Sequence, residues 1–349
     1  MIGAKGILAL DPELPGEMLC LRKCQTKFPG SKDSTLEICG ASYKRLPFYL
    51  NRQLIKILED LGTPPSAFLD LQHRAINTLK HVTTHPINAA RFLETNLIGV
   101  AARMPMLIRS LNAIGMNFRE DRFLRDVVEL AALIGVRTIK YRARILVEKG
   151  FTLYGTIDET GYLKEGEVYV PTRNNADGKF ELMLGLCLVT RSPALHPGDV
   201  QIAKAVNVPE DSPLRELTNC VVFSQHGARD LPSMLSGGDL DGDTYNVIFD
   251  HSLWPTHTHN PAEYPRVAAV DIGRTVEIHD MTNFFLDFMR TDRLGYISNL
   301  HLQAADQLPN GVKSDACLKL AEMASTAVDF SKTGVPVSQN SLLLWDHTS

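Results

Sequence analysis

The chain has 349 residues, with 36 lysines and arginines against 40 aspartates and glutamates, and a hydrophobic content of 44%. This length and apolar content suit about two globular domains with buried cores, and they exclude a disordered, collagen-like or disulfide-stapled small protein. No apolar run approaches the roughly 20 residues of a membrane span. The N-terminus lacks the basic cap and long apolar region of a secretory signal. We therefore expect no membrane association and an intracellular protein, with nucleus and cytoplasm equally compatible.

The net charge of −4 conceals two stretches of opposite sign. Residues 71–149 carry 13 lysines and arginines against 6 acidic residues, whereas residues 196–260 carry 3 against 9. This distribution is typical of an enzyme that holds a polyanion at a basic surface and divalent cations at an acidic one. For any single arginine, a solvated helix face is the alternative.

The six cysteines show no metal-binding pattern. Only Cys20 and Cys24 lie close in sequence, and no second pair or histidine partner follows at zinc spacing. We therefore expect all six to be reduced thiols.

The first half of the chain predicts a short extended region followed by helices. Residues 1–49 are expected to form extended segments and turns, because apolar runs at 6–10 and 18–21 are separated by prolines and glycine. From residue 50 leucines recur at helical spacing, and Gly62 before two prolines predicts the end of the first helix. Further helices are predicted over residues 66–79, 88–102, 106–114 and 119–134. Residues 50–135 are therefore assigned to a helical segment.

The period of the pattern changes after residue 135. Short runs rich in β-branched and aromatic residues, bounded by turn residues, predict strands at 144–157, 167–170, 180–189, 200–206, 220–223 and 245–249. Many short strands with turn signals indicate a barrel or a sandwich. We assign an all-β domain to residues 136–255. A helical C-terminal segment follows over 256–349, with helices at 281–306 and 316–330.

The strongest chemical signal is the run Ser-Gly-Gly-Asp-Leu-Asp-Gly-Asp at residues 236–243, which places Asp239, Asp241 and Asp243 within five residues. Like charges at this spacing raise one another's pKa unless a cation or strong donors offset the repulsion. Oxygen ligands favour a hard ion, Mg²⁺ or Mn²⁺. Gly238 and Gly242 permit tight turns and leave the rim open to a polyphosphate. The run therefore predicts a metal centre suited to phosphoryl transfer.

Three other interpretations compete for this run. An EF-hand needs Gly at loop position six and Glu at position twelve, where this chain has Thr244 and Asp250. An aspartyl-phosphatase motif follows an uninterrupted apolar strand, whereas residues 231–238 contain Pro, Ser and Gly. An exposed acidic turn explains a single Asp-Gly pair better than three carboxylates. On this run alone, metal-dependent catalysis and an acidic turn both remain open.

The longer string at residues 220–243, CVVFSQHGARDLPSMLSGGDLDGD, closely resembles the catalytic loop of the eukaryotic cellular RNA-dependent RNA polymerases of RNA silencing, especially the fungal members. Other stretches match the family in the same order, at residues 3–6, 22–28, 49–53, 158–161, 196–199 and 327–334. The resemblance spans nearly the whole chain, and such a series is far more specific than a single motif.

The resemblance implies an α+β, multi-domain fold with two double-psi β-barrels that face each other and helical insertions. In this chain the second barrel, residues 136–255, is expected to be complete, and residues 1–49 to be the remnant of a truncated first barrel. Family members usually carry a long stretch before the Lys-Gly segment and further helices after residue 334. We therefore expect a fragment of the catalytic core whose open strand edges lower its stability or require a partner fragment.

The resemblance also assigns roles to residues. Asp239, Asp241 and Asp243 would bind catalytic Mg²⁺ or Mn²⁺. The incoming triphosphate would be held by the cations Lys5, Lys27 and Arg191. Supporting roles are expected for Gly238, Gly242 and His196; by themselves, Lys5 is an ordinary exposed lysine and His196 a turn residue.

Two functions from different classes follow from these expectations. The first is a template-dependent nucleotidyltransferase that makes double-stranded RNA for silencing from an RNA template and ribonucleoside triphosphates, with other silencing proteins as candidate partners. The second is a non-catalytic relic of the family that still binds RNA.

Overall fold

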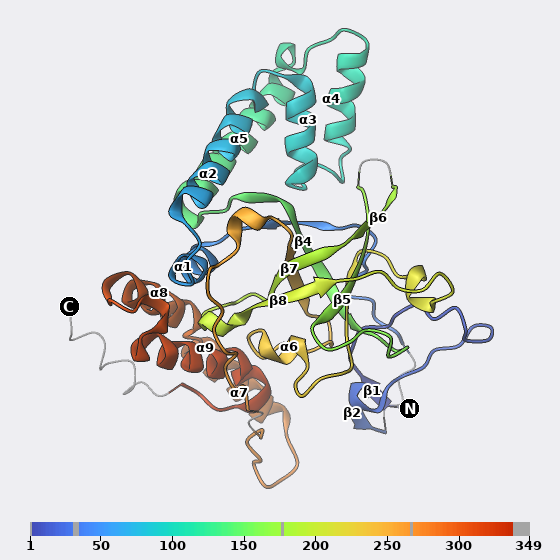
Figure 1. The fold of residues 1–349 in the computed structure, drawn as a ribbon, viewed down its shortest axis with the longest axis vertical. Helices are drawn as coiled ribbons and strands as arrows, with labels where there is room; N and C mark the ends of the chain where they lie inside the picture. Colours follow the sequence, from blue (N-terminus) through green and yellow to red (C-terminus); the bar gives the residue numbers. More distant parts are fainter. Residues whose placement is uncertain (1, 31–34, 176–177, 266–267, 338–349) are drawn as a thin grey trace.

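A closed β-barrel forms the centre of the computed structural model, which describes residues 2–30, 35–175, 178–265 and 268–337 (Figure 1). Its strands are β4 (Leu146–Ile157), β5 (Glu167–Arg173), β7 (Gly185–Thr190), β8 (Val200–Ala205), β9 (Cys220–Phe223) and β10 (Thr244–Ile248). Around the barrel the order is β10-β7-β8-β5-β9-β4, and β4 pairs again with β10 to close it. The pairs β4–β9 and β5–β8 are parallel, and the others are antiparallel. This mixed closed barrel fits the double-psi fold expected here.

Three of the barrel strands, β5, β9 and β10, are buried on both faces, whereas Ile202 and Lys204 of β8 are exposed. All four residues of β9 are buried, and in β10 only Thr244 is partly exposed. One face of these strands fills the interior with side chains that include Val168, Cys187 and Phe223. The other face packs against surrounding elements, so the barrel is a rigid base for the loops at its ends.

The predicted strand at 180–189 is two strands. Leu184 separates β6 (Phe180–Met183), which pairs with β5, from β7, which begins at Gly185 and enters the barrel. Gly185 has a φ of 104°, a left-handed value that interrupts a regular strand. The single prediction was wrong because a continuous apolar run conceals a turn when its only marker is one glycine.

The N-terminal region contains three strands. β1 (Ile2–Ala4) and β2 (Thr26–Pro29) form a two-stranded antiparallel sheet, whereas β3 (Leu46–Tyr49) joins the barrel sheet by pairing with β4. The apolar runs at 6–10 and 18–21, expected to be extended, lie outside any strand. Most of their large side chains are exposed, because no sheet partner covers them in the described structure.

The helical segment consists of α1 (Arg52–Asp60), α2 (Pro65–Val82), α3 (Pro86–Thr95), α4 (Met104–Ala113) and α5 (Arg122–Arg142). Helix α1 packs on the barrel, with Leu54, Ile57 and Leu58 in the same cluster as Val147. Helices α2 to α5 extend away from the barrel as an arm (Figure 1), with a core of their own that includes Leu93. Helix α5 runs past its predicted end at residue 134 and continues through Gly135, where the missing side chain allows close packing against Leu79 and Phe92.

Three helices close the described chain: α7 (Ile278–Thr291), α8 (Leu294–Gln307) and α9 (Asp315–Thr333). The predicted single helix at 281–306 is therefore wrong; Asp292 leaves the helical conformation and its carboxylate accepts a hydrogen bond from the Leu294 N–H. Helices α8 and α9 pack on the barrel through a cluster that includes Leu195, Ile297 and Leu320. The remaining helices are the short α6 (Leu231–Met234) and six 3₁₀ turns, at Lys23–Gln25, Phe118–Glu120, Pro197–Asp199, Pro213–Glu216, His251–Leu253 and Gly311–Lys313.

Two further sequence predictions concern thiols and membranes. All six cysteines are free, which confirms the prediction of reduced thiols. Over the described ranges of the chain, no helix has both the length and the apolar character needed to cross a bilayer.

The buried His301 of α8 makes the fold sensitive to acid. Its side chain is 1% exposed, and neither ring nitrogen has a hydrogen-bond partner among the described residues. Burial lowers the pKa of His301 from 6.5 to about 4. Between about pH 4 and pH 6.5, the unfolded chain therefore binds a proton at His301 that the folded chain does not. The free energy of unfolding is consequently unaffected by this group above pH 6.5 and decreases as the pH falls toward 4.

We expect His301→Gln to remove this part of the pH dependence. The free energy of unfolding from urea titrations should fall by about 2 kcal/mol more in the unsubstituted protein than in the variant between about pH 7 and pH 5. The matched control is His73→Gln, on the exposed face of α2, which should leave the pH dependence unchanged. Equal pH dependence in the unsubstituted chain and His301→Gln would contradict this assignment.

Candidate metal centre and phosphate site

The acidic loop connects α6 to β10 and turns sharply at Ser236 and Gly237. Their φ angles are 50° and 63°, in the left-handed region that favours glycine. The Gly238 N–H closes the turn by donating a 3.0 Å hydrogen bond to the Leu235 carbonyl. Because β10 pairs with both β4 and β7, the loop and its carboxylates are anchored directly to the barrel wall.

The structure brings the three aspartates of the loop together. One carboxylate oxygen from each of Asp239, Asp241 and Asp243 lies within 4.8 Å of the others, and all three residues are half-buried. The Asp239 N–H donates to the Asp243 carboxylate at 3.0 Å. Burial, with Asp241 and Asp243 nearby, raises the pKa of Asp239. The donor set of clustered, partly desolvated carboxylates fits a hard divalent cation.

Two cations from distant parts of the chain contact this triad. Lys5, which follows β1, places its Nζ 2.8 Å from Asp241 Oδ2, and Arg191, which follows β7, places its Nε 2.8 Å from Asp243 Oδ2. Arg191 also donates to Asp243 Oδ1 and to the Ser236 carbonyl, both at 3.1 Å. It therefore fixes the loop at both ends.

These contacts favour the charged forms of both Lys5 and Asp241. The hydrogen bond to Asp241 raises the pKa of Lys5. Burial acts to raise the pKa of Asp241, but the hydrogen bonds from Lys5 and with Asp239, together with the Lys5 and Lys27 charges, hold it below its ordinary value. Asp241 is therefore ionised at neutral pH, as a metal ligand must be.

Gly238 and Gly242 have different surroundings. A Cβ at Gly238 would lie 2.7 Å from Arg191 Cδ, 2.7 Å from the Tyr245 hydroxyl and 3.0 Å from the Pro232 carbonyl. The Tyr245 hydroxyl in turn donates to the Asp239 carbonyl at 2.9 Å. Gly242 has a φ of 135°, and a Cβ there would meet no described atom within 4 Å. Gly238 thus allows close packing of the groups that hold the triad, and Gly242 leaves one side of it open.

Asp199 anchors the loop from behind and was not among the predicted site residues. Its buried carboxylate accepts hydrogen bonds from the backbone N–H groups of Leu195, His196 and Ser236 and from the Tyr264 hydroxyl. The Ser236 bond connects the turn before β8 to the first residue of the acidic run. The sequence signal was present, since Asp199 lies in the family-like stretch 196–199, but its partners are distant in sequence.

The other predicted residues lie around the triad. Lys27 in β2 is close enough to lower the pKa of Asp241 by its charge, although it is not hydrogen-bonded to the triad. His196 accepts a 3.0 Å hydrogen bond from the Gly198 N–H, and burial with His259 and His301 nearby lowers its pKa to about 4. It is therefore a neutral turn residue beside Asp199, in line with a supporting role.

Lys332 of α9 is a neighbour that the sequence predictions missed. Its charge acts to lower the pKa of Asp239, and its Nζ lies 3.4 Å from Asp329. The C-terminal helix therefore contributes a positive charge near the triad. The family-like stretch 327–334 contains this lysine, but nothing in the local sequence indicates that α9 ends beside the acidic loop.

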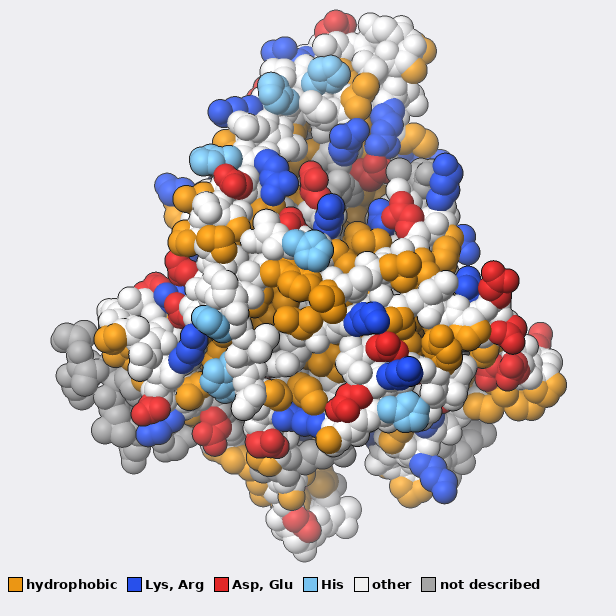
Figure 2. Space-filling model, viewed as in Figure 1, with side chains coloured by type: hydrophobic (Ala, Val, Ile, Leu, Met, Phe, Trp, Pro, Cys, Tyr) orange, Lys and Arg blue, Asp and Glu red, His pale blue; other side chains and the backbone are white. Residues whose placement is uncertain are grey.

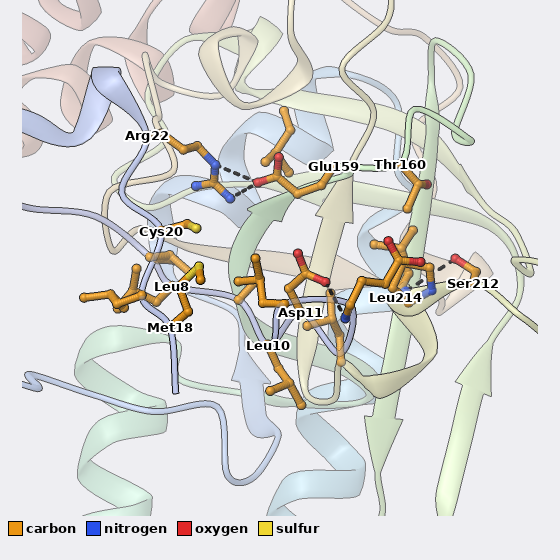
Figure 3. A pocket seen from close by; sticks show the side chains of 18 of the residues that line it. Leu8, Leu10, Asp11, Met18, Cys20, Arg22, Glu159, Thr160, Ser212 and Leu214 are labelled. Carbon is orange, nitrogen blue, oxygen red and sulfur yellow. Dashed lines mark hydrogen bonds and ion pairs between the residues drawn. The ribbon is translucent and has the colours of Figure 1, made fainter. Parts of the chain in front are cut away.

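The segment that carries Lys5 is held by hydrogen bonds within the N-terminal region and by an ion pair to the loop that follows β4. The Lys5 N–H donates to the Gln25 carbonyl at 3.0 Å, the Gln25 amide donates to the Ile7 carbonyl at 2.9 Å, and Arg22 forms an ion pair with Glu159. Figure 3 shows that ion pair at the edge of a cavity of about 1140 Å³. The cavity lies between residues 7–25 and residues 157–217, and none of its described lining residues belongs to the triad.

Comparison with known proteins gives a consistent set of relatives. The family model described as RNA dependent RNA polymerase matches residues 1–347. RNA-dependent RNA polymerase 1 of Arabidopsis thaliana is 35% identical over 337 residues, which cover 95% of this chain and 29% of that protein. RNA-dependent RNA polymerase 1 of Schizosaccharomyces pombe is 34% identical over 365 residues, covering 96% of this chain and 29% of that protein. The chain thus spans less than a third of these relatives.

A solved structure has the same fold. RNA dependent RNA polymerase QDE-1 from Thielavia terrestris superposes with a TM-score of 0.68, covering 93% of this chain and 40% of that chain at 22% identity. Together with the closed mixed barrel, this likeness confirms the predicted double-psi α+β fold.

Proposed function

Since the chain belongs to the RNA-dependent RNA polymerase family, we propose that it joins ribonucleoside triphosphates on an RNA template and produces double-stranded RNA for RNA silencing. The observation that carries this proposal is the cluster of Asp239, Asp241 and Asp243 within 4.8 Å of one another, in contact with Lys5 and Arg191. Phosphoryl transfer is accelerated mainly by positioning and charge neutralisation, and this arrangement offers both.

The metal ligands in this proposal are the three aspartates, and the ion is Mg²⁺, with Mn²⁺ as the alternative. When bound, the ion would neutralise charge on the reacting phosphate and activate a hydroxyl nucleophile. The carboxylates suit it because they are already close together, ionised at Asp241 and held by backbone and arginine donors. The open side at Gly242 gives a triphosphate room to approach.

The cations of the site bind and orient the triphosphate in this proposal. The Lys5 side chain is 62% exposed, so phosphate oxygens reach it readily, and Lys27 lies in the neighbouring strand β2. The Arg191 side chain is only 16% exposed and holds Asp243 through two nitrogens. Arg191 therefore positions the loop, while Lys5 and Lys27 contact substrate.

The proposal is tested with the whole purified chain, an RNA template and labelled ribonucleoside triphosphates. We expect product that depends on the template, resists single-strand-specific nuclease and disappears on chelation of divalent cations. The non-catalytic relic predicts retention of RNA without incorporation under Mg²⁺ or Mn²⁺. That result, obtained with folded protein, would refute the polymerase proposal for this chain.

RNA is expected to contact the arm through its unpaired cations. Figure 2 shows basic side chains spread over the arm with fewer acidic ones among them. Arg74, Lys80 and Arg91 are exposed and make no ion pair within the described structure. Because base pairing supplies sequence specificity, contacts to phosphates are the kind of contact this protein needs.

Replacing Arg74, Lys80 and Arg91 together by alanine is expected to weaken RNA binding about tenfold or more. The slope of log K against log salt concentration should also become less steep, by about 2. Fluorescence anisotropy over a range of salt concentrations measures both. The matched control is Arg109→Ala, because Arg109 is already paired with Glu94. An unchanged salt slope in the triple variant would place the RNA elsewhere.

A further inference from the structure

Helix α5 has two apolar faces, and only one of them packs against other described residues of the chain. The inner face packs against α2 and α3 through residues that include Leu124, Val128 and Ala131. The outer face leaves large apolar side chains in solvent: Phe123 (68% exposed), Leu130 (57%), Leu133 (57%), Ile134 (47%) and Tyr141 (59%). A helix with an apolar outer face of this size needs a partner.

The outer face has the spacing of a helix-pairing seam. Positions 123, 127, 130, 134, 137 and 141 alternate in steps of four and three, which is the heptad pattern of packed helices. The seam runs nearly the full length of the helix, about 30 Å. Two charged residues lie on opposite sides of its centre: Asp126, which flanks the seam toward the N-terminal end, and Arg137, which lies in the seam toward the C-terminal end.

We propose that the outer face of α5 binds the same face of a second copy of this chain, with the two helices antiparallel about a two-fold axis that crosses the outer face at the height of residue 132; Ala132 itself is buried on the inner face. In the register that sets Phe123 beside Tyr141 of the other copy, Leu130 lies beside Ile134. The same register brings Asp126 close to Arg137. One axis thus satisfies the apolar pairs and the charge pair together, as an isologous interface requires.

The charges favour this orientation over the parallel one. A parallel pair in register would set Arg137 against Arg137 and Asp126 against Asp126, which is repulsive. Within the described chain Arg137 makes no ion pair, and the contacts of Asp126 with Arg122 and Arg125 are long, at 3.7 and 3.5 Å. Both residues are therefore available across the axis. An apolar seam is also poorly suited to RNA phosphates, which makes a protein face the better occupant.

The first test is sedimentation equilibrium of the whole chain and of Leu130→Asp. We expect a dimer at micromolar concentration, and a dissociation constant raised at least about tenfold in the variant. Ile114→Asp is the matched control, because Ile114 is also exposed but lies off α5, at the end of α4. A monomeric unsubstituted chain, or a dimer that Leu130→Asp leaves intact, would overturn the proposal.

The second test separates orientation from folding. Asp126→Arg and Arg137→Asp should each weaken the dimer, and the double variant should restore it. For crosslinking, Cys20, Cys24 and Cys39 are first replaced by serine, since these are the exposed cysteines. A mixture of Leu130→Cys and Ile134→Cys chains should form disulfide dimers under oxidation faster than either variant alone. Faster crosslinking of Leu130→Cys by itself, or no rescue by the double charge variant, would refute the antiparallel register.

Discussion

Asp241→Asn is expected to reduce RNA synthesis about a thousandfold while leaving the chain folded. Asparagine keeps the size of the side chain but removes the charge that binds the cation and pairs with Lys5 at 2.8 Å. A loss of about 4 kcal/mol of transition-state stabilisation corresponds to this factor. Template-directed incorporation measured under saturating substrates gives the rate, and a Mn²⁺ binding titration gives the metal affinity independently of turnover.

The matched control is Asp250→Asn in the same acidic stretch. Asp250 begins the 3₁₀ turn His251–Leu253, where its carboxylate accepts from the Ser252 N–H, and asparagine serves that capping role equally well. Its rate and Mn²⁺ affinity should match those of the unsubstituted chain. Comparable incorporation by Asp241→Asn and Asp250→Asn would remove Asp241 from the catalytic proposal.

Gly238→Ala is expected to lower RNA synthesis about a hundredfold although it touches no substrate. The new methyl group would lie 2.7 Å from both Arg191 Cδ and the Tyr245 hydroxyl, so one of them must move. These side chains hold Asp243 and the Asp239 carbonyl, and a displacement near 1 Å at reacting groups has a cost of about this size. Initial rates as a function of nucleotide concentration should show a fall in kcat.

Gly295→Ala provides the comparison for this effect. Gly295 lies in α8 with nothing within 4 Å of a Cβ position, so alanine should leave the rate unchanged and stabilise the helix by up to about 1 kcal/mol. Thermal unfolding of both variants separates a local rearrangement from loss of the fold. Full activity in Gly238→Ala would show that the close packing behind the loop is not needed.

The sequence predicted those parts of the molecule that local patterns encode. The acidic run places three carboxylates within five residues, so their convergence follows from the chain itself. Barrel strands such as β9 and β10 were predicted because they are short runs rich in β-branched and aromatic residues, bounded by turn residues. The double-psi connection of these strands came from the family resemblance, because strand order depends on pairings distant in sequence.

Contacts between distant segments escaped prediction for the same reason. Asp199 meets Ser236 and Tyr264, and Lys332 approaches Asp239, only because the barrel and α9 bring their segments together. Asp199 lies in a family-like stretch, but its role as an anchor becomes visible only when the four donors around its buried carboxylate are counted in the structure. The outer seam of α5 was in the sequence, but the pattern of one helix does not tell which of two apolar faces its own chain will cover.

The contact between Lys5 and Asp241 joins residues 236 positions apart. During synthesis the lysine leaves the ribosome long before the aspartate exists, so this contact forms only after most of the chain has been made. The backbone between Lys5 and the Arg22 tether has little regular structure. After a single proteolytic cut in this stretch, Lys5 would be held only by non-covalent contacts, such as the β1–β2 pairing and its ion pair with Asp241. Such a cut would test how much the metal centre depends on this segment while leaving the covalent chain of the barrel intact.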